Sequence, residues 1–80
     1  QYNLYYRMNR YEIICKLDTD FLILIKQGLI PVHLLGWKTI YEKYLEERKA
    51  HKKMVSYLYL SDYYKLSETQ IRNIIKFMSC

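Results

Sequence analysis

Residues 67–78 read SETQIRNIIKFM, and this stretch decides the fold because its pattern predicts an α-helix with two unlike faces. Apolar side chains recur at the i, i+3, i+4, i+7 spacing of one helical face, namely Ile71, Ile74, Ile75 and Met78. Polar side chains recur at the same spacing on a second face, namely Thr69, Arg72, Asn73 and Lys76. We expect the apolar face to dock on the preceding helices. The polar face, which carries two positive charges and no acid, should stay exposed.

The start of this helix and the turn before it are also predicted by local patterns. Ser67 and Gln70 have the spacing of a capping box, in which each side chain accepts from the other residue's backbone N–H. Only Lys65 and Leu66 lie between Ser67 and a second predicted helix over 53–64, and so short a turn makes two helices cross steeply. Leu66 is the apolar residue that should pin this corner. The predicted buried side of the second helix consists of Met54, Val55, Leu58 and Tyr64, with the small Ser61 within it.

Residues 59–76, YLSDYYKLSETQIRNIIK, resemble a DNA-binding helix-turn-helix. In that family an apolar and a small residue follow each other in the first helix, as in Leu60-Ser61, and the turn carries an apolar residue and a serine, as in Leu66-Ser67. Two apolar anchors of the second helix match Ile71 and Ile74. The turn position that usually holds Gly is Lys65 here, and Ser61 replaces the commoner Ala. The phrase YYKLSETQIRNIIKFM is most similar to small phage-type and bacterial regulators, including activators related to the Mor family.

This resemblance implies that the unit 53–78 binds double-stranded DNA and that the protein regulates transcription. The C-terminal helix would enter the major groove, with Gln70, Arg72 and Asn73 at base edges, because Arg suits guanine and Asn or Gln suits adenine. Phosphate contacts would come from the helix start, its last basic residue and the neighbouring lysines, namely Ser67, Thr69, Lys76, Lys65, Lys52 and Lys53. One such module buries little DNA surface, so we expect a homodimer. Its contact would be the tyrosine-rich first residues or the helix that carries Trp37.

The rest of the chain predicts further helices and no confident strand. Residues 1–17 are an N-terminal arm or a short element, and Tyr11, Ile13, Ile14 and Leu17 fit a helix face but also allow a strand. Asp18 or Asp20 offers an N-cap for a helix through Gln27, and Gly28 is placed to end it. Pro31 lies where the next helix begins. The buried face of that helix is predicted to hold Trp37, Ile40, Tyr41, Tyr44 and Leu45.

These elements make a single all-α domain over residues 1–80, a compact bundle of about four helices ending in the helix-turn-helix. Since no residues follow the last helix in this sequence, we expect no β wing. Eighty residues, of which 51% are hydrophobic, suffice for one small core. The net charge is +5, and residues 37–80 hold nine basic and five acidic residues. This basic excess favours an anionic partner, although the run 48–53 is more typical of a solvated loop than of a contact patch.

Several classes of function lack support. No catalytic set, nucleotide loop or metal-ligand spacing is recognisable, so we expect no enzyme, no cofactor, no metal and no small-molecule substrate. The apolar stretch 21–37 is too short and too polar for a membrane helix, which indicates a cytoplasmic protein without a membrane partner. Cys15 is predicted to be a small buried hydrophobe, and most tyrosines are predicted to fill the core. Two alternatives stay open: a helical adaptor that binds an acidic protein, and a helix-turn-helix kept only as a scaffold.

Overall fold

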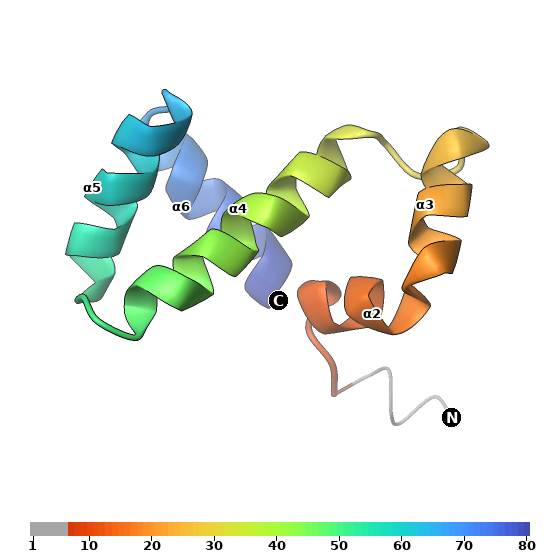
Figure 1. Ribbon diagram of the computed structural model, residues 1–80, viewed down its shortest axis with the longest axis horizontal. Coiled ribbons are helices and arrows are strands. Elements are labelled where there is room, and N and C mark those ends of the chain that lie inside the picture. Colours follow the sequence, from red (N-terminus) through yellow and green to blue (C-terminus); the bar gives the residue numbers. More distant parts are fainter. Residues whose placement is uncertain (1–6) are drawn as a thin grey trace.

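The computed structural model describes residues 7–80, which form five helices and no strand (Figure 1). The helices are α2 (Arg10–Leu17), α3 (Thr19–Lys26), α4 (His33–Arg48), α5 (Lys53–Tyr64) and α6 (Glu68–Ser79). The all-α prediction is confirmed, with one helix more than the expected four. None of these five helices has both the length and the apolar composition that a bilayer crossing requires.

Residues 10–17 are helical, which decides between the helix and the strand that the sequence allows there. The helix begins because Asn9 and Glu12 form a capping box: the Glu12 N–H donates to Asn9 Oδ1 at 2.7 Å, and the Asn9 N–H donates to Glu12 Oε1 at 2.9 Å. At the same end, Arg10 ties α2 to the end of α6 through its N–H, which donates to the Cys80 carbonyl at 3.0 Å. The part of the predicted arm that covers residues 1–6 lies outside the described residues.

Short connections join the next helices. Asp18, with a φ of 49°, occupies the N-cap position of α3, one of the two that the sequence predicts, but its side chain makes no capping hydrogen bond. Gly28 ends α3 as predicted: it has a φ of 77°, and its N–H donates to the Ile25 carbonyl while the Leu29 N–H donates to the Leu24 carbonyl. Pro31 is not the first residue of the next helix, because α4 begins two residues later at His33.

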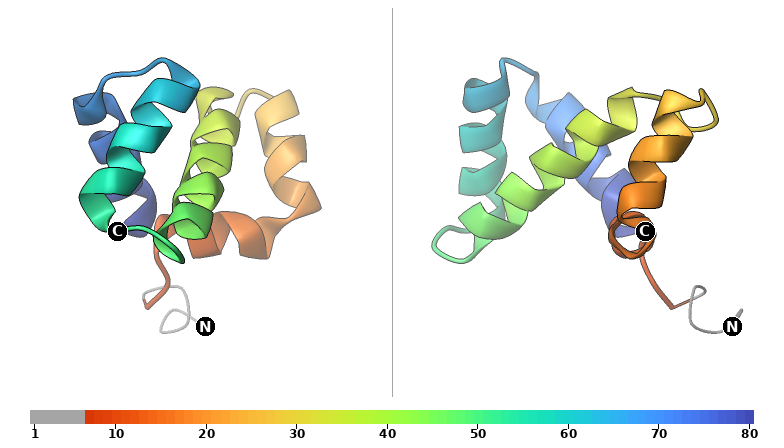
Figure 2. Two further views of the ribbon diagram at one scale, coloured as in Figure 1. Left: turned by 60° about the vertical axis from the view of Figure 1, so that its left-hand side comes forward. Right: turned by 45° about the vertical axis from the view of Figure 1, so that its right-hand side comes forward.

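The core lies where α4, α5 and α6 pack on one another, and α2 closes one side of it (Figure 2). Three stacked tyrosines form part of this core, as expected of most tyrosines: the ring centroids of Tyr41 and Tyr44 are 6.0 Å apart, and those of Tyr44 and Tyr57 are 5.8 Å apart. The apolar face of α6 is buried as predicted, and its Ile71 and Met78 have no exposed surface. Leu60 of α5 is also fully buried.

The predicted buried side of α5 is wrong for three of its four residues. Met54, Val55 and Leu58 are exposed by 58%, 47% and 53%, and only Tyr64 is partly buried against the core. The buried side lies two positions further along, at Ser56, Tyr57 and Leu60. Packing against α4 and α6 decides this side: Tyr57 stacks on Tyr44 of α4, and the small Ser56 is fully buried.

Two single-residue predictions are also wrong. Leu45 of α4 is exposed, because the buried face of that helix ends with Ile40, Tyr41 and Tyr44. Cys15 is exposed instead of being a buried hydrophobe, because α2 turns Ile14 into the core and leaves the next side chain outside.

Candidate nucleic-acid interface

The corner between α5 and α6 is held by a left-handed lysine and by a serine. Lys65 has φ 58° and ψ 40°, the conformation that the family resemblance associates with Gly at this position. The Leu66 N–H donates to the Ser61 carbonyl at 3.1 Å, and the Ser61 hydroxyl donates to the Leu66 carbonyl. Leu66 packs against the core, as predicted for the residue that pins the turn. From this corner α5 and α6 diverge (Figure 1).

The capping box at the start of α6 is present as predicted. The Gln70 N–H donates to Ser67 Oγ at 3.1 Å, and the Ser67 N–H donates to Gln70 Oε1 at 2.9 Å. The side-chain oxygen of Gln70 is therefore engaged within the protein, and its amide NH₂ group is what it can offer to a base. The backbone N–H groups of the first turn of α6 point out of the helix start, where they suit an anion.

The exposed face of α6 consists of the four predicted polar residues, Thr69, Arg72, Asn73 and Lys76. Arg72 and Lys76 lie at one edge of this face, where they line a groove between α4, α5 and α6. Asn73 and Gln70 lie at the other edge, where they line a smaller hollow of about 330 Å³ beside Trp37 and Leu66. The polar face of α6 therefore lies between this groove and this hollow.

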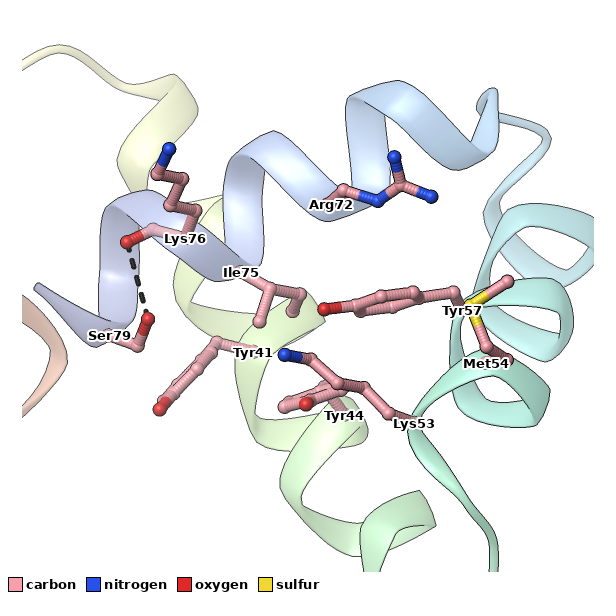
Figure 3. A pocket seen from close by; sticks show the side chains of 9 residues that line it. All are labelled: Tyr41, Tyr44, Lys53, Met54, Tyr57, Arg72, Ile75, Lys76 and Ser79. Carbon is pink, nitrogen blue, oxygen red and sulfur yellow. Dashed lines mark hydrogen bonds between the residues drawn. The ribbon is translucent and has the colours of Figure 1, made fainter.

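The groove at the first edge has a volume of about 710 Å³ and joins three cations from two helices (Figure 3). Its floor is formed by the three stacked tyrosines of the core. Lys53 and Arg72 lie on opposite sides of the Tyr57 ring, with Lys53 Nζ 6.0 Å and Arg72 Cζ 5.8 Å from the ring centroid. Lys76 completes the set, and none of the residues described as lining the groove is acidic. Such a groove attracts anions, because no carboxylate offsets its positive charge.

Two tyrosines of this floor, Tyr41 and Tyr44, stay neutral well above physiological pH because their pKa values are raised. Burial raises the pKa of Tyr44, and contact with Tyr57 raises it further, while Lys53 and Arg48 act in the opposite direction. Burial also raises the pKa of Tyr41. These two phenols therefore bring no negative charge to the groove.

Some basic residues of the run 48–53 contact other groups of the protein, and one of them lines the groove. The Arg48 guanidinium donates to the His51 carbonyl at 2.8 Å, and Lys49 Nζ lies 3.3 Å from a carboxylate oxygen of Glu46. Lys53 alone of this run lines the groove, while Lys52 is exposed at the N-cap of α5. Lys65 is exposed at the corner, where its Nζ lies 3.9 Å from an Asp62 carboxylate oxygen. Three predicted contact residues thus share one site: Lys53, Arg72 and Lys76.

Of the three tyrosines that shape this groove, the sequence predicts Tyr41 and Tyr44 to be buried but does not predict Tyr57. Tyr57 was not among the expected buried residues of α5, although Ser56, Leu60 and Tyr64 stand at positions that share a helical face with it. That spacing was the available signal. It was obscured because Met54, Val55 and Leu58 form an equally apolar stripe on the same helix.

Comparison with protein-family models, with curated proteins and with solved structures found no match. Within residues 7–80, no three His, Cys, Asp or Glu side chains lie close enough together to hold a metal ion.

Proposed function

We propose that this protein is a transcriptional regulator that binds duplex DNA, with α6 as the helix that enters the major groove. The observation that carries the proposal is the outward polar face of α6, with Lys53 of the neighbouring helix beside Arg72 and Lys76 across one groove. The α5–α6 corner and the capping box add the local geometry that a helix-turn-helix uses.

The dimensions and charges of this face suit DNA. The 12 residues of α6 span about 18 Å at about 1.5 Å per residue, and the major groove of B-DNA is about 12 Å wide. Arg72 and Asn73 are the residues that we assign to base edges, because both are exposed and carry donors that match purines. Lys53, Lys76 and the N–H groups at the start of α6 would contact phosphates and set the register of the helix.

A salt titration of duplex binding tests the proposal. The affinity should fall steeply as salt rises, with a slope that reports the number of phosphates neutralised. Lys76→Ala should weaken binding to all sequences alike and reduce that slope by about 1. Lys49→Ala is the matched control: it removes an exposed lysine that pairs with Glu46 outside the groove, so the slope should not change.

The base contact is tested with sites selected from a random duplex pool. Arg72→Ala should cost about 1–3 kcal/mol of binding free energy at one base pair and relax the sequence preference there. A loss of similar size on every sequence would instead assign Arg72 to a phosphate.

The adaptor hypothesis makes a different prediction from the same residues. An acidic protein partner would meet Lys53, Arg72 and Lys76 through carboxylates, and duplex DNA would not compete at moderate salt. If neither random duplex nor a selected pool is retarded at low salt, DNA binding is wrong and the adaptor is the function to test.

A further inference from the structure

The outer face of α3 is apolar at its centre and oppositely charged at its two ends. Phe21 is the one buried residue of this helix, which packs chiefly against α2. Ile23 and Leu22 are exposed by 53% and 51%. Asp20 in the first turn and Lys26 in the last turn are exposed on the same side as Ile23, because all three are spaced by three residues.

The charges on this face have no partner within the described protein. Asp20 and Lys26 belong to none of the ion pairs among residues 7–80. They are also the only Asp, Glu, Lys or Arg residues between positions 19 and 35, so this segment is neutral in a protein of net charge +5. A second copy of a basic protein meets the least repulsion at such a segment.

We propose that α3 is a self-association surface, at which two copies pair their α3 helices in antiparallel fashion about a two-fold axis. Such an axis brings Ile23 of one copy against Ile23 of the other. It also brings each Asp20 to the Lys26 of the partner helix, because a two-fold contact applies the same pairing twice. An acidic or a basic partner would satisfy only one end of the face.

Two further exposed apolar residues follow α3 along the chain. Leu29 and Val32 are exposed by 73% and 70% in the segment between α3 and α4. Because α3 has only eight residues, we expect the contact to bury less than the roughly 1,600 Å² of a typical stable complex, and the dimer to be weak and dependent on concentration. In all three views α3 lies at the end of the molecule away from α5, so this pairing lies away from the α5–α6 corner (Figures 1 and 2).

Charge reversal tests the antiparallel pairing without DNA. Sedimentation velocity over a concentration series should show a monomer–dimer equilibrium for the unchanged protein. Asp20→Lys and Lys26→Asp should each raise the dissociation constant about tenfold or more, because each places like charges opposite one another. The double variant Asp20→Lys/Lys26→Asp should restore dimerisation, since the exchanged charges again meet their opposites.

A second pair of variants separates this surface from the other exposed apolar helix. Ile23→Lys should abolish the dimer, because it places two lysines at the two-fold axis. Leu58→Lys is the matched control on α5, since Leu58 has the same exposure of 53% and should leave the dimer intact. Circular dichroism of each variant establishes that the helices are retained.

Three results would overturn the proposal. The first is a protein that stays monomeric at every concentration. The second is a double variant no better than the single variants. The third is a dimer that survives Ile23→Lys but is lost either in Leu58→Lys or on removal of residues 1–6. That last result would assign the contact to α5 or to the first residues. The DNA proposal does not depend on the outcome, because α6 contributes nothing to this contact.

Discussion

The left-handed conformation of Lys65 sets the direction of the chain at the corner between α5 and α6. Its left-handed backbone costs an L-amino acid about 1–2 kcal/mol, which is why Gly is favoured at such positions. The chain holds this conformation because Leu66 packs on the core and hydrogen bonds with Ser61 close the turn. Lys65 therefore holds a backbone conformation for which Gly is the favoured residue.

At this scale we predict that Lys65→Gly stabilises the protein. The free energy of unfolding should rise by about 0.5–1 kcal/mol, because relief of the left-handed strain exceeds the entropy that Gly adds to the unfolded chain. Urea denaturation followed by circular dichroism measures it. Lys65→Ala is the control: it removes the exposed contact with Asp62 but keeps the strain, so it should change little. A loss of stability in Lys65→Gly would contradict this account of the corner.

Among the helices, α6 contributes residues both to the core and to the candidate interface. Four of its residues are buried and the four residues of the predicted polar face are exposed, so any rotation of the helix would move both sets at once. The capping box defines where the helix begins, and with it which N–H groups are offered to a phosphate.

Removal of the cap should weaken the fold measurably. Ser67→Ala should lower the free energy of unfolding by about 0.5–2 kcal/mol, because the Gln70 N–H loses its acceptor. Ser67→Asp should recover most of this loss, since Asp also caps helices well. Thr69→Ala, which changes an exposed side chain two residues after Ser67, serves as the neutral comparison in the same thermal or urea melts. Equal effects of Ser67→Ala and Thr69→Ala would show that the cap contributes nothing.

On the scale of the whole molecule, the tyrosine-rich core couples stability to alkaline pH. Burial is the first cause that raises the pKa of Tyr11, Tyr41, Tyr44 and Tyr64 above the ordinary value. In the unfolded chain these phenols ionise near pH ~10. Between that pH and their higher native values, the folded state binds more protons than the unfolded state, so stability falls as pH rises.

We therefore expect these protonated tyrosines to contribute fully to the free energy of unfolding below pH ~10, and this contribution to be lost progressively above that pH. Thermal melts in a series of alkaline buffers measure this loss, and tyrosinate absorbance reports ionisation in the same samples. Tyr44→Phe should make the alkaline loss smaller, because it removes one of the groups that ionise more readily in the unfolded chain. A melting temperature unchanged through the range where tyrosinate forms would contradict the prediction.

The helices and their caps were largely predictable because they depend on contacts three or four residues apart. Ser67 and Gln70 meet within one turn, and Gly28 ends α3 by its own backbone freedom. The α5 face was mispredicted because two apolar stripes compete on that helix, and local spacing does not choose between them. The stripe that contains Tyr57 is the buried one, and Tyr57 stacks there on Tyr44, which lies thirteen positions away along the chain.

The sequence by itself determined that the chain is all-α and that α6 turns its isoleucines inward and Arg72, Asn73 and Lys76 outward. It did so because helical periodicity and capping are properties of neighbouring residues. Only the tertiary structure decided that Lys53 joins Arg72 and Lys76 around one groove, that Cys15 is exposed, and that α3 leaves Ile23 uncovered. These outcomes depend on how helices distant in sequence pack together, because burial is shared between partners that a single stretch of sequence does not contain.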